Sequence, residues 1–320
     1  MDEPLMMPLI LMLWWIFSLA ILITIILSAS GKLRPELRAE IVRRTLSWLV
    51  IIPFVVGPIL AGAAWTILML FVLSLLCYRE FARATGLFRE RSMSLVVVLG
   101  IAALYFTVLD HWYGLFMALP SLILAVLALV AILPDRPKGY VQRVGLAALS
   151  FMLFGVSLGH LGYMANDRSY RSLIVLVFLA VQLNDVFAFC VGKSLGGPKL
   201  CPHTSPNKTV SGSLGAIVLT TALVWALTGY VFREPPLSGH GHRILLGLIL
   251  SLTGQLGDLM MSSVKRDVGI KDMGSFIPGH GGFLDRFNSL LLAAPAAFHY
   301  VGYLRGFGLD QPVRIITGGG

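Results

Sequence analysis

The stretch that decides the fold and the chemistry of this chain covers residues 255–289 and reads QLGDLMMSSVKRDVGIKDMGSFIPGHGGFLDRFNS. An apolar run ends in a basic pair, passes through a glycine-rich segment and returns to apolar sequence. If the first part is a helix, one polar stripe crosses its apolar surface, because residues three or four apart share a face; its members are Gln255, Asp258, Ser262 and Lys265. A second stripe begins the next helix and consists of Asp285, Asn288 and Ser289.

Carboxylates inside apolar runs suggest a site, because an unpaired charge within a bilayer is costly. Asp258 and Asp285 could face each other across a loop that holds cationic side chains, namely Lys265, Arg266, Lys271 and His280. Carboxylate oxygens suit a divalent cation and cationic donors suit phosphate. The glycine-rich turn at 278–282 could also bring backbone N–H groups close to an anion. On residue types alone, a helical hairpin with a solvated basic loop is an equal alternative.

This stretch resembles the signature of the CDP-diacylglycerol synthases, also called phosphatidate cytidylyltransferases. The resemblance is carried by the string Ser262-x-Val264-Lys265-Arg266-x4-Lys271-Asp272-x-Gly274-x2-Ile277-Pro278-x-His280-Gly281-Gly282-Phe283-x-Asp285-Arg286-Phe287. The string is long and mixed in residue type, so chance agreement is improbable. One position departs, because the family pattern closes with Asp where this chain has Asn288.

A second chemical region covers residues 184–215. Asp185 lies within an apolar span, and Ala188, Phe189 and Gly192 follow it at helical spacing, which could admit backbone or ligand beside the carboxylate. The run from Gly192 resembles a phosphate-binding P-loop only superficially, since it follows a membrane helix and lacks the earlier glycine.

Two elements of this region resemble the same family. They are Asp185-x-x-Ala188-Phe189-x-x-Gly192-Lys193 and Ser205-Pro206-x-Lys208-Thr209. Relatives have Glu where this chain has Ser211, which is a second departure. The run at 79–83 also resembles the family, and the resemblance as a whole covers roughly residues 180–290.

Composition predicts an all-α, polytopic integral membrane protein. The chain is 57% hydrophobic and 13% charged, with a mean hydropathy of +0.82. The net charge of +9 suggests contact with anionic headgroups or an anionic substrate. Nucleic acid is an improbable partner, because no basic domain with interleaved aromatic residues is present. The cysteines show no C-x-x-C spacing and are interpreted as packing residues.

The apolar runs predict about ten transmembrane helices. The first, 5–27, is too long and too acidic at its start for a secretory signal. The run 46–78 is long enough for two helices and should break near Gly62. The others are 93–109, 113–133, 144–164, 172–192, 214–232, 244–263 and 285–304. We expect a scaffold at 1–170, a catalytic region at 171–310 and a tail at 311–320, of which the last six residues, 315–320, should be disordered.

Charge predicts the orientation of these helices. The connections on one side of a ten-helix arrangement, with Arg286 at the last boundary, hold 19 of the 25 lysines and arginines. That side should therefore be cytoplasmic, with both termini outside. Both chemical regions have their loops on this side, where a nucleoside triphosphate is available. We expect the inner membrane of a bacterium.

The resemblance implies an enzyme that joins CTP to phosphatidate in the membrane, giving CDP-diacylglycerol and pyrophosphate. It implies Mg²⁺ bound by Asp258 and Asp285, a second cation being left open, with Lys265 as a third catalytic residue. Substrate binding is assigned to Asp185, Ser205, Lys208, Thr209, Ser262, Arg266, Lys271, His280, Gly281, Gly282 and Arg286. Association into a homodimer is left open.

Two alternatives remain. A transporter would also use intramembrane acids and broken helices, but transporters commonly contain internal repeats, and no second copy of the Asp258 hairpin is found. A diverged family member, using another lipid phosphate or nucleotide or lacking catalysis, is suggested by Asn288 and Ser211.

Overall fold

The computed structural model describes residues 51–167, 169–232, 236–276, 281–306 and 314–318. Seven helices in these ranges are long and apolar enough to cross a membrane, which agrees with the predicted all-α membrane fold. They are α3 (Ala63–Ala84), α4 (Arg91–Leu109), α5 (Tyr113–Val130), the α6–α7 unit (Tyr140–Met164), α8 (Tyr170–Leu195), α9 (Val210–Val231) and α10 (His240–Asp267).

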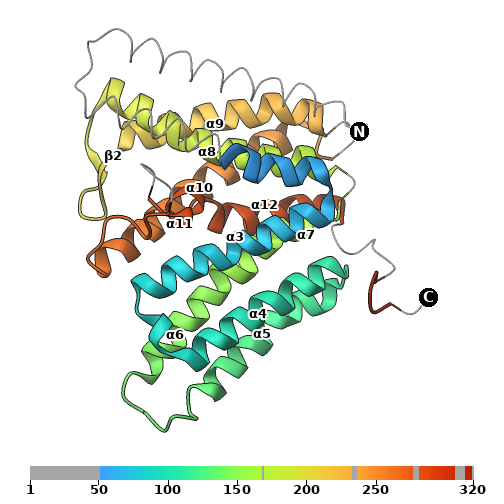
Figure 1. The fold of residues 1–320 in the computed structure, drawn as a ribbon. Coiled ribbons are helices and arrows are strands. Elements are labelled where there is room, and N and C mark those ends of the chain that lie inside the picture. Colours follow the sequence, from blue (N-terminus) through green and yellow to red (C-terminus); the bar gives the residue numbers. More distant parts are fainter. Residues whose placement is uncertain (1–50, 168, 233–235, 277–280, 307–313, 319–320) are drawn as a thin grey trace.

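Shorter elements complete the described part of the chain (Figure 1). The α6–α7 unit consists of α6 (Tyr140–Ser150), a π-helical segment η2 (Phe151–Ser157) and α7 (Leu158–Met164). The others are a helix at Ile51–Ala61, the 3-10 turn η1 (Leu87–Arg89), α11 (Phe283–Phe287), α12 (Leu290–Arg305) and the antiparallel strands β1 (Lys199–Cys201) and β2 (Ser205–Thr209).

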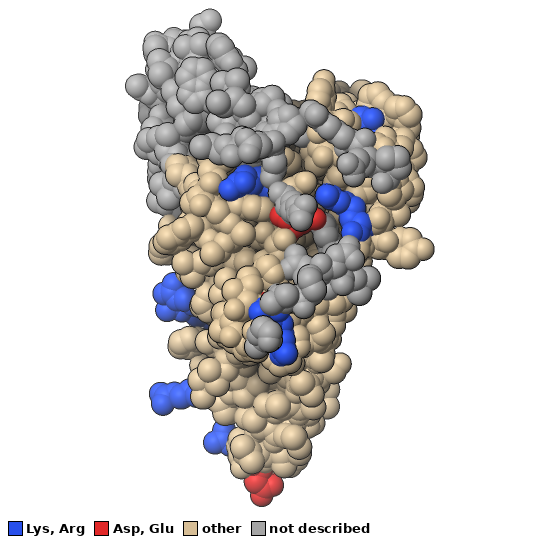
Figure 2. Space-filling view, turned by 90° about the vertical axis from the view of Figure 1, so that its right-hand side faces the viewer, with Lys and Arg blue, Asp and Glu red and all other residues tan. Residues whose placement is uncertain are grey.

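The described part of the face shown in Figure 2 is largely uncharged. Figure 2 shows Lys and Arg only in separate patches on the face turned to the viewer. Large apolar side chains on the candidate spans are exposed, among them Leu129, Phe189 and Val218. Hydrocarbon chains of a bilayer would cover such side chains at no desolvation cost, so these features fit an integral membrane protein.

The predicted helix boundaries are confirmed at Gly62 and corrected at the last span. Gly62 has φ +146° between Ala61 and Ala63, a backbone conformation that glycine adopts readily, so the helix breaks there. The span predicted at 285–304 is divided between α11 and α12. The side chain of Asn288 accepts a hydrogen bond from the Ser289 N–H at 2.7 Å, which competes with helical bonding at the division. The helix predicted at 5–27 lies outside the described residues.

Close packing of α8 against α9 fixes the second chemical region. A Cβ on Gly192 would lie 2.6 Å from the Thr209 hydroxyl, and one on Gly212 would collide with the Ala188 carbonyl. The predicted small-residue face is therefore confirmed for Ala188 and Gly192. Phe189 does not belong to it, since its side chain is 67% exposed. The contact holds the start of α9, and with it β2, beside the end of α8.

A buried polar network ties α8, α9 and α10 together next to the acidic residues. The Asn184 side-chain oxygen accepts hydrogen bonds from Thr220 at 3.0 Å and from Ser251 at 2.7 Å. One turn further along α10, the Gln255 side-chain oxygen accepts a hydrogen bond from the Ser213 hydroxyl at 2.5 Å. Because each buried polar group needs a partner, this network sets the register of the three helices.

Part of the C-terminal tail is ordered, contrary to the expectation of disorder. The Asp110 carboxylate, at the end of α4, accepts hydrogen bonds from the N–H groups of Ile316 at 2.5 Å and Thr317 at 3.0 Å. The Arg314 guanidinium lies over the Trp112 ring at 4.7 Å. These contacts hold residues 314–318 at the end of the bundle away from β2 and α11 (Figure 1).

Candidate active site

Asp258 lies on α10 and is held by two side chains from elsewhere in the chain. The Lys208 ammonium, at the end of β2, lies 2.5 Å from Asp258 Oδ2. The Asn288 amide donates a hydrogen bond to Asp258 Oδ1 at 2.7 Å. The lysine and aspartate side chains are 19% and 21% exposed, although the Lys208 ammonium nitrogen is itself buried. Folding thus joins the two chemical regions of the sequence directly.

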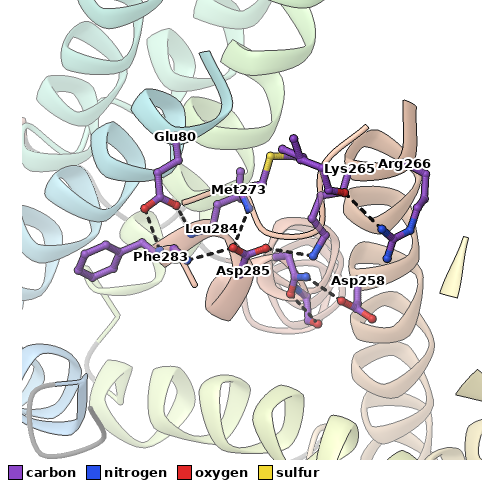
Figure 3. Close-up of polar contacts among 12 residues, drawn as sticks. Glu80, Asp258, Lys265, Arg266, Met273, Phe283, Leu284 and Asp285 are labelled. Atoms are coloured by element: carbon purple, nitrogen blue, oxygen red, sulfur yellow. Dashed lines mark hydrogen bonds and ion pairs between the residues drawn. The ribbon is translucent and has the colours of Figure 1, made fainter. Parts of the chain in front are cut away.

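Asp285 lies in the first turn of α11 and is more deeply buried, at 2% exposure (Figure 3). Its Oδ1 pairs with the Lys265 ammonium at 3.0 Å. Its Oδ2 accepts hydrogen bonds from the N–H groups of Met273 at 2.8 Å and Gly282 at 3.0 Å. Gly281 has φ +79°, and a Cβ there would lie 2.8 Å from Oδ2. The Asp285 carboxylate therefore binds α10, the segment that follows α10 and the residue that precedes α11.

Asp185 belongs to the same site as Asp258. Its Oδ2 accepts a hydrogen bond from the Ser289 hydroxyl at 3.4 Å, and that hydroxyl also lies 3.3 Å from the Asn288 side-chain oxygen. Charges that act on Asp185 include Asp258, Lys208 and Arg286. The junction between α11 and α12 thus connects two acids that the sequence placed on separate helices.

Thr209 and Arg266, predicted to bind substrate, hold the loops in place. The Thr209 hydroxyl accepts a hydrogen bond from the Gly212 N–H at 3.1 Å and so caps α9. The Ser211 hydroxyl, at the second departure from the family, donates to the Gly196 carbonyl and ties α9 to the end of α8. Arg266 donates to the Thr204 carbonyl and the Ile270 carbonyl, both at 3.3 Å. These contacts connect the β-hairpin to the end of α10.

The remaining predicted residues have varied positions. Ser205 pairs with Cys201 across the hairpin, Ser262 is buried on α10, and Lys271 is exposed. The Arg286 carbonyl accepts a hydrogen bond from the Gln182 side chain at 3.0 Å, which links α8 to α11. His280 lies outside the described residues.

Glu80 on α3 is a further residue of this region, which sequence reasoning missed. Its Oε1 accepts a hydrogen bond from the Phe283 N–H at 3.1 Å, and its Oε2 accepts one from the Leu284 N–H at 2.9 Å. Glu80 is 8% exposed. Residue 80 follows the predicted apolar run 46–78 and stands next to Arg79, so the sequence does not mark it as a buried acid that needs a partner. The run at 79–83 was interpreted only through its resemblance.

The chemistry of the donors fits a hard divalent cation better at Asp258 than at Asp285. Both are carboxylates, the ligands that Mg²⁺ prefers. Both Asp285 oxygens already accept protein donors, whereas the Asp258 carboxylate is partly exposed and close to Asp185. No group of three or more His, Cys, Asp and Glu side chains gathers as a metal site within the described ranges.

These features define a class of protein, a polytopic helical membrane protein with paired lysines and aspartates where its helices meet two polar loops. Comparison with known sequences then gives the family. The model of the cytidylyltransferase family matches residues 42–304. The chain belongs to the cytidylyltransferase family, and it is accordingly a nucleotidyltransferase.

Individual relatives agree with this assignment. The chain is 34% identical over 201 residues to the phosphatidate cytidylyltransferase of Rickettsia bellii, covering 56% of this chain and 87% of that one. It is 34% identical over 210 residues to the phosphatidate cytidylyltransferase of Bacillus subtilis, covering 63% of this chain and 77% of that one. It is also 30% identical over 297 residues to the uncharacterized protein YnbB of Escherichia coli, covering 90% of this chain and 96% of that one.

Proposed function

We propose that this protein transfers the cytidylyl group of CTP to phosphatidate, giving CDP-diacylglycerol and pyrophosphate. The names of the Rickettsia and Bacillus relatives support these substrates. The observation that carries the proposal is the presence of two lysine–aspartate ion pairs, Lys208 with Asp258 and Lys265 with Asp285. A triphosphate and a lipid phosphate both need cationic donors held in fixed positions, and the acids hold these lysines.

In this reaction a phosphate oxygen of the lipid attacks the α-phosphorus of CTP. The new P–O bond forms as the bond to the β-phosphate oxygen breaks, and pyrophosphate leaves with the bonding electrons. The attacking oxygen is ionised at neutral pH, so no general base is needed. The protein's main task is to offset the negative charge of the two substrates and the leaving group, which falls to Lys208 and Lys265.

Mg²⁺ would be held by Asp258, with Asp185 as the adjacent acid, and would supply charge neutralisation to the phosphates. Asp285, the other predicted ligand, would bind it only by giving up one of its protein donors. Arg266 and Thr209 would act mainly by keeping the two loops together, as their backbone contacts indicate. Lys271, which is exposed beside the site, would reach toward the triphosphate.

A purified-protein assay tests the proposed substrates. Phosphatidate and several other lipid phosphates are each offered with each of the four nucleoside triphosphates, and pyrophosphate release is measured. We expect turnover with CTP and phosphatidate. Turnover with a different pair would assign another nucleotidyl transfer to the same site.

A diverged activity is the second candidate. It is favoured by the two departures from the family pattern, Asn288 and Ser211, both of which take part in hydrogen bonds at the site. The similarity to YnbB extends over 90% of this chain, whereas that to the Rickettsia enzyme extends over 56%. The substrate panel above distinguishes this candidate.

We place the two active loops on the cytoplasmic side of a bacterial inner membrane. Ser205 and Ser275 are separated by two candidate spans, α9 and α10, whereas Ser238 lies between those spans. Cysteines introduced at Ser205 and Ser275 should react only with reagents that enter the cell, and one at Ser238 should react with an impermeant reagent. Labelling of Ser205 and Ser275 from opposite sides would contradict a shared site.

The amide at position 288 should weaken the affinity for Mg²⁺. In Asn288→Asp a carboxylate would replace the donor that lies 2.7 Å from Asp258 Oδ1. Two like charges about 4 Å apart repel by about 4 kcal/mol at an effective dielectric constant of about 20, and a cation between them removes that cost. We expect a lower Mg²⁺ concentration at half-maximal activity, and a larger increase in thermal stability on adding Mg²⁺ than in the unmodified chain. Equal midpoints and equal stability shifts would place residue 288 outside the metal's surroundings.

A further inference from the structure

The carboxylate of Glu80 joins the first half of the chain to the candidate active site. Figure 3 shows Glu80 directed from α3 toward the start of α11, where its two oxygens accept hydrogen bonds from successive backbone N–H groups, those of Phe283 and Leu284. Asp285 is the next residue along the chain. Glu80 thus holds the two backbone N–H groups that immediately precede Asp285, one of the carboxylates of the site.

Space for this carboxylate is provided by two glycines. A Cβ on Gly274 would lie 2.6 Å from Glu80 Oε1, and one on Gly282 would also collide with the carboxylate. The segment between α10 and α11 therefore contacts Glu80 at two places, Gly274 and Gly282. Any side chain at Gly274 would displace either the segment or the glutamate.

Helix α11 needs such a contact. It has five residues, which is too short to be stable by its own hydrogen bonds, so tertiary contacts decide where it lies. Its first turn is held from one side by Glu80 on α3 and from the other by the pair of Asp285 with Lys265 on α10. If Glu80 releases the first turn, the direction of the Asp285 carboxylate is no longer fixed, and Lys265 loses its fixed partner.

We propose that Glu80 is a positioning residue for Asp285 and Lys265, and that α3, which lies in the region expected to be a scaffold, therefore contributes to the site. The expected change in kcat rests on the proposed function, whereas the expected change in hydrogen exchange around α11 does not depend on it. Glutamate is needed because both oxygens accept N–H groups. Glutamine offers one acceptor and one donor, so one N–H group would face another donor, and aspartate is shorter by one methylene.

The test compares Glu80→Gln with the matched control Glu90→Gln. Glu90 precedes α4, and its side chain makes no capping hydrogen bond there. Hydrogen–deuterium exchange of the peptide covering 281–287 is measured together with kcat and with KM for CTP and phosphatidate. In Glu80→Gln we expect faster exchange at 283 and 284 and a fall in kcat of ~10- to 100-fold, with each KM within about twofold. Glu80→Asp should recover part of both losses, and Glu90→Gln should change neither quantity.

A second pair of variants keeps the test decisive if Glu80→Gln folds poorly. Gly274→Ala should lower kcat through its collision with Glu80. The same change should cost less in a Glu80→Ala background, where the colliding oxygens are absent and the Gly282 Cα, 3.1 Å away, is the remaining close contact. Unchanged exchange at 283 and 284 in Glu80→Gln, or additive effects of Gly274→Ala and Glu80→Ala, would overturn the proposal. If the unmodified chain shows no turnover with CTP and phosphatidate, the proposed function fails, while the exchange measurement still decides the role of Glu80.

Discussion

Asp258→Asn is expected to lower the rate of cytidylyl transfer by at least ~100-fold while the protein still inserts and purifies normally. The volume of the side chain is almost unchanged, but the charge opposite the Lys208 ammonium is removed. The lysine then loses the partner that holds it 2.5 Å away. The proposed Mg²⁺ site would also lose one anionic ligand. Pyrophosphate release per milligram of monodisperse protein measures the effect.

Asp267→Asn is the matched control for this variant. Asp267 ends the same helix, α10, and its side chain is exposed, so the same chemical change there should leave the rate within about twofold, as is usual for surface substitutions. Substantial activity in Asp258→Asn, or full activity of the unmodified chain in excess chelator, would remove Asp258 and Mg²⁺ from the mechanism.

Asp285→Asn is expected to abolish activity and also to loosen the segment around α11. Its side chain is 2% exposed, and breaking a buried ion pair from one side typically costs about 3–5 kcal/mol. An asparagine can accept a hydrogen bond from a backbone N–H, but its amide would then face the Lys265 ammonium, donor against donor. We expect a lower midpoint of thermal unfolding and faster hydrogen exchange at 272–285, with a loss of at least ~100-fold in rate.

The double variant Asp285→Asn with Lys265→Met separates stability from catalysis. Removing the ammonium eliminates the unpaired buried charge, so the midpoint of thermal unfolding should partly recover while activity stays absent. Recovery of activity together with stability would show that the ion pair has only a structural role.

The sequence by itself identified which residues carry charge into apolar surroundings, but not which of them pair. It placed Asp258 and Lys265 on one face of a helix, and α10 runs through both as a single helix. It also suggested that Asp258 faces Asp285. In the structure each acid has its own lysine instead, Lys208 for Asp258 and Lys265 for Asp285. Periodicity indicates the face of a helix, whereas the partners lie on other elements, β2 for Asp258 and α10 for Asp285.

The second polar stripe, which consists of Asp285, Asn288 and Ser289, also shows that periodicity does not reveal the partners of a side chain. Asp285 and Asn288 were assigned to one helical face, yet α11 ends at Phe287 and the two side chains have different partners. A five-residue helix has little intrinsic stability, so the division was decided by contacts with α3 and α10 and not by propensity. Glu80 was missed for a related reason, because its partners are backbone N–H groups more than 200 positions away and carry no sequence signal.

Hydropathy and residue type therefore determined the membrane fold, the approximate helix positions and the two chemical regions. These are local properties, since each apolar run must satisfy its own backbone within a bilayer. Tertiary structure alone decided that Lys208 meets Asp258, that Asn288 and Ser289 connect Asp258 to Asp185, and that α3 supplies a carboxylate to α11. Those pairings depend on how closely helices approach, which glycines such as Gly212 and Gly257 set through contacts with distant backbone.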